Sequence, residues 1–332
     1  MLRHLFPLDT AASFTLRIFG GAIAICLLVA IVARLLRRRR LARVAAVAAL
    51  LAAGGWGFLH ATKPAWLRFA LANPVPAPYS DFSGWTARAP GLETGEIELS
   101  IDGRWVDRIS LCRLDPRLHR FSVHWDGTPR AVEDWQRALG AELVINGSYF
   151  LPGGTPQTPL RRAGLAAGPT RYASIHGAFV AGDEVAEVAI LDLRGKDVLT
   201  AIAPFPEAMV SYPLLLDPSG EVRAPPARDW LASRTFIAQD SGERVIVGTT
   251  RSGFFTLRRL GEYLKVSPLG IRVALNFDGG PVATQLVKTP TYERLAVGNA
   301  EITDGGDVAR VFYQAHRTTR WNLPIVLAAT PR

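Results

Sequence analysis

Cysteine is almost absent from this chain, which has only Cys26 and Cys112 among its 332 residues. Cys26 lies in a long apolar run near the N-terminus and Cys112 lies far along the chain, so we expect no disulfide between them. No C-x-x-C pair occurs, and the six histidines show neither H-x-H nor H-E-x-x-H spacing. The sequence therefore gives no support to a zinc site, and we expect no metal and no other cofactor.

Acidic residues are scarce in the first 63 positions, and most of the net positive charge of the chain is found there. Nine Lys or Arg residues stand against the single acid Asp9, so +8 of the net charge of +9 belongs to this segment and +1 is left for residues 64–332. A nearly neutral domain has no electrostatic footprint for a phosphate backbone. We therefore expect no nucleic-acid partner.

The first segment does contain two apolar runs, Ile18–Ala33 and Val44–Leu59, with six arginines between them at positions 34, 37–40 and 43. This pattern predicts two transmembrane helices, and the arginines favour a cytoplasmic loop between them. The membrane is then a partner of the chain, and the large domain lies on its outer side, periplasmic or extracellular. The alternative is a single anchor or an uncleaved signal segment, with the second run lying on the membrane.

The rest of the chain divides into a linker and a folded domain. Residues 64–90 are rich in proline and small polar residues, which is typical of a linker. The expected organisation is a transmembrane hairpin over residues 1–63, a linker over 64–90 and a domain over 91–332.

Strands and helices both occur in the predicted domain. Runs at 96–101, 106–114 and 120–125 have much of the period-two alternation of half-buried strands. Thr128 and Thr256 are candidate N-caps of two amphipathic helices. The predicted fold class is α+β, a mixed β-sheet domain with packed helices, preceded by the two transmembrane helices.

Two short segments of the domain resemble each other, GAELVIN at 140–146 and GIRVALN at 270–276. Each follows a predicted helix, begins with glycine, ends with asparagine and leads into a turn that contains glycine. We expect two helix–strand units whose strands end side by side, with polar side chains at one edge of the sheet, where ligands commonly bind. Asp278 then faces a cleft; the alternative is an Asp-Gly hairpin that leaves it on an exposed turn.

Four segments occur in order along the domain: INGSYF at 145–150, YPLLLDPSGE at 212–221, SRTFIAQD at 233–240 and ALNFDGG at 274–280. With them the chain resembles exported members of the phosphodiester glycosidase family, from about Gly91 to Thr330. The resemblance implies a mixed α/β fold and hydrolysis of a sugar 1-phosphodiester, with a glycan or sugar phosphodiester as the substrate. Ala238, Pro281 and Val282 depart from the family pattern, which often has Gly, Gly and Ser there, and Pro281 lacks an amide donor.

The chemistry implied by this resemblance needs a carboxylate. Cleavage of a sugar C1–O bond passes through an oxocarbenium-like state, which a carboxylate stabilises or attacks, and Asp278 is the candidate. A phosphate monoester, with a second pKa of about 6, is a far better leaving group than an alkoxide, so one carboxylate suffices. Asn146 is the second candidate catalytic residue, either donating to sugar hydroxyls or orienting Asp278, although an Asn-Gly pair alone is typical of a turn. Asp240 is a weaker candidate for a second carboxyl and is more typical of a turn.

Substrate binding is predicted from polar and aromatic residues of the same segments. Arg234 suits bidentate phosphate binding, with a surface ion pair as the alternative. Tyr149 offers a platform for a sugar ring, or else packs in the core. The full set is Arg234, Thr235, Gly279, Gly280, Tyr149 and His176, the last also consistent with a core histidine.

Two other function classes are compatible with these residues. The first is a non-catalytic glycan-binding module on the same fold, which the departures at Ala238 and Pro281 favour. The second is an enzyme that cleaves the P–O bond, which the lack of clustered metal ligands disfavours.

Overall fold

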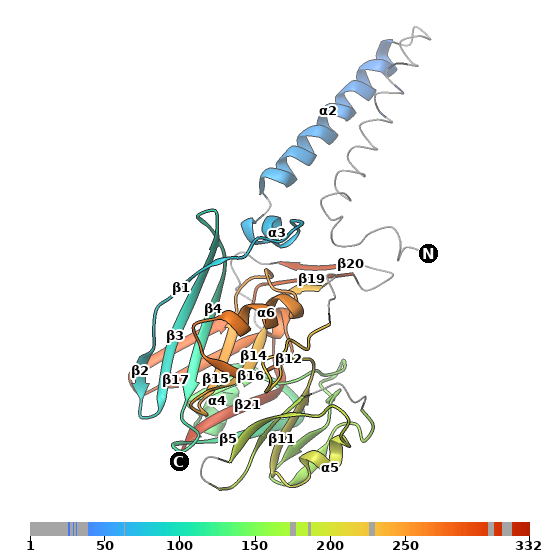
Figure 1. The fold of residues 1–332 in the computed structure, drawn as a ribbon. Coiled ribbons are helices and arrows are strands. Elements are labelled where there is room, and N and C mark those ends of the chain that lie inside the picture. The colour runs from blue at the N-terminus through green and yellow to red at the C-terminus, as the bar shows by residue number, and fades with distance from the viewer. Residues whose placement is uncertain are drawn as a thin grey trace.

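The computed structural model describes residues 39–62, 64–172, 177–184, 187–225, 230–304, 309–313 and 321–332, together with Cys26, Val29 and Ile31. The described domain is mostly antiparallel β-sheet with short helices on its outer faces (Figure 1). The predicted α+β class is therefore wrong. The prediction failed because it missed strands such as Thr235–Asp240 and Val245–Thr250. Every residue of these strands is buried, so no alternation of polar and apolar residues marks them as strands.

The largest sheet in the described part has eight strands, in the order β1-β3-β4-β15-β14-β16-β12, with β2 paired to β3. Each pair is antiparallel. β1 and β2 lie within the residues expected to form a linker, and both pair with β3. The strands are β1 (Tyr79–Phe82), β2 (Thr86–Ala89), β3 (Leu92–Ile101), β4 (Arg104–Leu114), β12 (Leu214–Leu216), β14 (Thr235–Asp240), β15 (Val245–Thr250) and β16 (Ile271–Asn276).

A second sheet of five strands packs on the first, in the order β18-β17-β6-β21-β5. Its strands are β5 (His119–Arg130), β6 (Leu143–Asn146), β17 (Thr284–Thr289), β18 (Tyr292–Val297) and β21 (Leu323–Pro331). One buried cluster fills the space between the sheets, with Ile237 and Val247 from the large sheet and Leu143 and Leu327 from the second. The two sheets thus form a sandwich.

Helices cover both outer faces of this sandwich. On the large sheet, Phe236 shares a cluster with Leu260 of α6 (Leu257–Val266) and Trp66 of α3 (Ala65–Ala70). On the second sheet, Val326 packs with Trp135 of α4 (Val132–Leu139). The order of layers is helix, sheet, sheet, helix, and this explains why β14 is buried on both faces.

The remaining described elements form two further sheets and three further helices. One sheet has the order β10-β9-β11-β7-β8 and the other the order β13-β19-β20. Their strands are β7 (Leu160–Arg162), β8 (Leu165–Ala167), β9 (Gly177–Ala181), β10 (Val188–Asp192), β11 (Glu207–Ser211), β13 (Trp230–Ala232), β19 (Ala300–Asp304) and β20 (Ala309–Tyr313). The helices are α2 (Arg39–Thr62), α5 (Val198–Ile202) and the 3₁₀-helix η2 (Gly280–Val282).

The prediction of two transmembrane helices is wrong. Among the described residues, no helix is long and apolar enough to cross a membrane. Most of Ile18–Ala33 lies outside these residues, and Val44–Leu59 lies in α2. This helix begins at Arg39, so it includes arginines that were assigned to a loop, and it continues with many alanines and glycines. The outward placement of the large domain depended on this hairpin and stays a prediction.

Several predictions from local sequence are confirmed within the domain. The three predicted strands are confirmed as β3, β4 and β5, and Thr256 caps α6 by accepting the N–H of Arg259 at 3.2 Å. The first helix begins at Val132 instead of after Thr128, because β5 continues to Arg130, which pairs with Leu323 of β21.

Candidate active site

The two similar segments end at the same place in the molecule. β6 ends at Asn146 and β16 ends at Asn276, and the chain after each strand bonds to the other. The backbone N–H of Asp278 donates to the carbonyl of Gly147 at 3.1 Å, and Asn146 Nδ2 donates to the carbonyl of Asp278 at 2.8 Å. The strand ends therefore meet as the sequence predicts, but they come from two packed sheets and not from one.

Both ends of the Asn146 side-chain amide form hydrogen bonds at this junction. Its Oδ1 accepts from Thr235 Oγ1 at 2.8 Å and from the backbone N–H of Thr284 at 3.0 Å. Because the side chain is only 2% exposed and its amide is bonded on both sides, its geometry fits the role of orienting Asp278. Thr235 is fully buried, and its hydroxyl contacts Asn146 and does not line the cleft.

The Asn-Gly pair at 146 and 147 has a packing reason and is not a hairpin turn. β6 pairs with β17 and β21 and not with a strand directly after it. A Cβ at Gly147 would lie 2.6 Å from Ile325 Cγ2, so only glycine lets this segment pass so close to β21.

Asp278 lies between β16 and η2, at the mouth of the junction. β16 and the next strand, β17, belong to different sheets, so the Asp-Gly hairpin alternative is wrong. The carboxyl Oδ1 accepts the N–H of Gly279 at 2.8 Å. Pro281 stands in the first turn of η2, where a helix needs no backbone donor, and Ala238 packs in the core beneath α6, away from this loop.

A cleft of about 420 Å³ opens at Asp278. Arg234, directly before β14, lines this cleft and is only 3% exposed. Its Nε donates to the carbonyl of Phe255 at 3.2 Å and its Nη2 to the carbonyl of Trp230 at 2.7 Å, so the guanidinium is held rigidly. Among the described residues that line it, the cleft thus has one carboxyl and one fixed cation.

Aromatic side chains form much of the cleft wall. Tyr149, Tyr172, Tyr212 and Trp230 all line it. The Tyr149 hydroxyl donates to the carbonyl of Tyr212 at 2.6 Å and accepts from Asn276 Nδ2 at 2.8 Å, which fixes its ring. Burial raises the pKa of Tyr149, so its hydroxyl keeps its proton for this bond.

The environment shifts both charged groups of the cleft. The pKa of Asp278 is raised from its ordinary value of 3.8 to about 7, mainly by burial and also by the nearby charge of Glu301, whereas the Gly279 N–H and Arg234 act to lower it. Burial lowers the pKa of Arg234 to about 10, so the guanidinium stays charged at neutral pH. A carboxyl that changes its charge near neutral pH beside a permanent cation is typical of a catalytic site.

Glu301 is a site residue that the sequence does not reveal. Its Oε1 accepts from Trp230 Nε1 at 3.0 Å, and its Oε2 lies 2.6 Å from where a Cβ of Gly280 would stand. Gly280, at φ +63°, therefore makes room for a second carboxyl beside the Asp278 loop. No local motif marks Glu301, because its place depends on the pairing of β19 with β13, where it faces Ala232.

The other predicted residues have different places. Gly279 lines the cleft, and a Cβ there would lie 2.6 Å from the carbonyl of Ser233. The N–H of Gly280 donates to that same carbonyl at 2.8 Å, so it is used within the fold. Asp240 is bonded to Gly242 and Arg244 in the hairpin between β14 and β15. His176 lies outside the described residues.

The residues of this cleft lie in a segment that matches a known protein family. The sequence model of the phosphodiester glycosidase family matches residues 139–314, more than half of the chain. The chain belongs to this family. Each residue placed at the cleft above, from Asn146 to Glu301, lies inside the matched segment of the phosphodiester glycosidase domain.

This phosphodiester glycosidase domain is similar in fold to the first of two solved structures. The zebrafish N-acetylglucosamine-1-phosphodiester alpha-N-acetylglucosaminidase catalytic domain, auto-inhibited by its pro-peptide, has a TM-score of 0.52 and 16% identity, over 78% of this chain and 89% of that one. A hypothetical protein from Synechocystis has a TM-score of 0.47 and 14% identity, over 78% of this chain and 65% of that one. A search of curated proteins finds no match.

Proposed function

We propose that this chain hydrolyses the C1–O bond of a sugar 1-phosphodiester. The observation that carries the proposal is the pairing, in one cleft, of the Asp278 carboxyl with the buried Arg234 guanidinium. Membership of the phosphodiester glycosidase family supports the reaction class, and the name of the zebrafish relative supports a sugar phosphodiester as substrate.

Each group has a role that its position suits. Arg234 binds the phosphodiester anion, whose charge grows on the leaving phosphate as the C1–O bond breaks. Asp278, as a carboxylate, faces the anomeric carbon and stabilises the positive charge that develops there. Tyr149, Tyr212 and Trp230 provide flat walls for the sugar ring.

Asn146 and Glu301 act on Asp278 and not on the substrate. Asn146 holds the Asp278 backbone by its carbonyl at 2.8 Å. Burial opposes the ionisation of Asp278 most strongly, and the charge of Glu301 adds to this effect, so that Asp278 titrates near neutral pH. The phosphate monoester leaves without protonation by an enzyme acid, because its own second pKa is about 6.

Isotope labelling tests which bond breaks. The full chain is incubated with the methyl phosphodiester of N-acetylglucosamine in water enriched in heavy oxygen, and the methyl phosphate is analysed by mass spectrometry. This product is chosen because the anomeric oxygen of a free sugar exchanges with water. We expect methyl phosphate without label, since water attacks carbon. Label in the methyl phosphate would move the reaction to phosphorus, and binding without release across a panel of sugars would leave a glycan-binding module.

The pH dependence of turnover tests the role of Asp278. Because its pKa is about 7 and the active form is the carboxylate, kcat/KM is expected to rise with pH through about 7 and then to level off. Glu301→Gln removes the neighbouring negative charge while keeping an oxygen for Trp230, so the midpoint is expected at a lower pH. Glu293→Gln, on β18 and paired with Lys288, is the matched control and should leave the midpoint unchanged. A rate that falls through pH 7 would instead make Asp278 an acid.

A further inference from the structure

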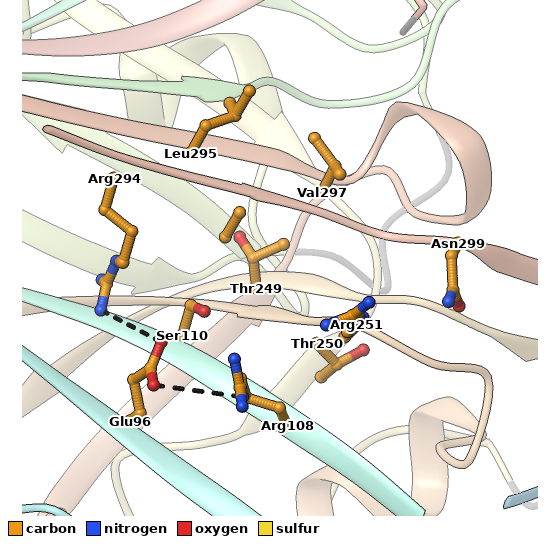
Figure 2. A pocket seen from close by; sticks show the side chains of 11 residues that line it. Glu96, Arg108, Ser110, Thr249, Thr250, Arg251, Arg294, Leu295, Val297 and Asn299 are labelled. Carbon is orange, nitrogen blue, oxygen red and sulfur yellow. Dashed lines mark ion pairs between the residues drawn. The ribbon is translucent and has the colours of Figure 1, made fainter. Parts of the chain in front are cut away.

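A second pocket lies between the large sheet and β18, the edge strand of the second sheet. Its volume is about 300 Å³, and none of the residues that line it also lines the cleft at Asp278. Figure 2 shows side chains from β3, β4, β15 and β18 around it. This size is at the lower end of ligand pockets and suits a small molecule.

Positive charge dominates this pocket. Arg108, Arg251 and Arg294 line it, against the single carboxylate of Glu96, which lies 4.0 Å from Arg108 and 3.8 Å from Arg294 (Figure 2). Arg108 also pairs with Glu98, outside the pocket. The exposed Arg251 guanidinium has no hydrogen bond or ion pair within the described ranges of the chain. The pocket therefore offers a free cation.

Three buried polar atoms at the pocket also have no partner within the part of the chain that the structure describes: Thr249 Oγ1, Asn299 Oδ1 and Arg294 Nε. The side chains of Thr249 and Asn299 are 2% and 6% exposed. An unsatisfied buried polar group costs about 1–3 kcal/mol, so such groups are rare in folded proteins. All three belong to residues that line one pocket, so a polar occupant would give them partners once these side chains turn toward it.

The donor and acceptor types define this occupant. Arg251 and Arg294 only donate, although Arg294 already donates to the carbonyls of Gly95 and Leu111 and to Gln285 Oε1. Thr249 donates or accepts, and the amide of Asn299 presents either its oxygen or its NH₂ group. A phosphate group has acceptor oxygens for the donors and, when protonated once, an O–H for the Asn299 oxygen. A metal cation is repelled by the arginines, and an uncharged ligand leaves Arg251 without a counter-charge.

We propose that this pocket binds a phosphate group, either free or in a small phosphomonoester. In a monoester, the carbon skeleton would lie on the apolar side of the pocket, to which β18 contributes Leu295 and Val297. The pocket and the cleft are neighbours, because Thr249 pairs with Thr235, whose hydroxyl holds Asn146. The proposal does not depend on hydrolysis at Asp278, since its test measures binding alone.

Calorimetric titration of the full chain tests the proposal, with inorganic phosphate, glucose 6-phosphate and glucose as probes. We expect both phosphates to bind and glucose not to bind. Arg251→Gln removes the free cation, and Thr249→Val removes the unpartnered hydroxyl at nearly constant volume. Each is expected to weaken binding by about tenfold or more.

The controls separate this pocket from other positive sites. Arg120→Gln removes an exposed arginine on β5 and should leave binding unchanged. Arg234→Lys weakens any phosphate binding in the cleft and should leave the second pocket unaffected. Tighter binding of glucose 6-phosphate supports a monoester, and tighter binding of inorganic phosphate supports the free ion. No phosphate binding by the folded chain, or binding unchanged in both Arg251→Gln and Thr249→Val, would overturn the proposal.

Discussion

Asp278→Asn is expected to lower kcat by about 10²- to 10⁴-fold, the usual range for loss of a catalytic carboxyl. The amide has nearly the same volume, and its oxygen can still accept the N–H of Gly279, which Asp278 Oδ1 accepts at 2.8 Å. The loop conformation is therefore kept while the negative charge at the anomeric carbon is lost. Single-turnover rates on the methyl phosphodiester measure this effect without a contribution from product release.

Asp240→Asn is the matched control for this change. Asp240 accepts from Gly242, Arg244 and the Arg244 side chain in a hairpin turn, so its substitution is expected to lower stability by about 1–3 kcal/mol with kcat unchanged. A kcat of Asp278→Asn within a few-fold of the wild type would remove Asp278 from the chemistry.

The pH dependence of stability tests the ionisation of Asp278 independently of turnover. The pKa of Asp278 is raised in the folded state from 3.8 to about 7, so its ionisation is opposed by folding. The stabilising contribution of the protonated form is complete below about pH 4 and is lost as the pH rises through about 7. Asp278→Asn cannot ionise there, so its melting temperature relative to the wild type is expected to rise between about pH 4 and pH 7 and then to level off.

Arg234→Lys is expected to lower kcat/KM by a factor of about 10², which corresponds to about 3 kcal/mol for a buried charged contact. Lysine keeps the charge but cannot reproduce the planar group that holds the carbonyls of Phe255 and Trp230 and still faces the cleft. Because the phosphate gains charge as it leaves, kcat should fall as well as KM rise. Steady-state kinetics over a range of substrate concentrations separates the two.

The control for this change is Arg113→Lys on β4. Arg113 is largely buried, pairs with Glu93 at 2.6 Å and stacks over Trp85 at 4.3 Å, remote from the cleft. A similar loss of stability is expected from this variant, with kcat/KM unchanged. Equal kcat/KM losses in the two variants would mean that Arg234 has a structural role only.

The sequence indicates those site residues whose positions follow from local structure. Asn146 is the last residue of the buried strand β6, and Asp278 follows the end of β16 by two residues; the segments that begin with glycine show where those strands end. Glu301 has no such signal, because its place is set by a pairing between β13 and β19, whose bonded side chains Trp230 and Glu301 are 71 positions apart. The fully buried strands were missed for a similar reason, since layers on both sides remove the polar alternation.

The start of a helix is also set by pairing between distant strands, which local sequence does not reveal. The sequence at Thr128 and Pro129 has the signals of a helix start, yet these residues lie in β5. The strand continues past them, because Arg130 pairs with Leu323 of β21, far along the chain, and no local pattern encodes that pairing. At Thr256 no neighbouring strand competes, and the cap forms where it is predicted.

The hydrogen bond between Asn146 and Asp278 makes catalytic activity depend on the order in which parts of the chain fold. This bond joins residues 132 positions apart: Asn146 belongs to the second sheet, and Asp278 lies in the loop after β16 of the large sheet. Contacts of such high sequence separation form slowly, because the entropy of closing a long loop is lost before the contact stabilises it. We therefore expect recovery of turnover during refolding to lag behind recovery of β-structure, which makes catalysis a reporter of sheet docking.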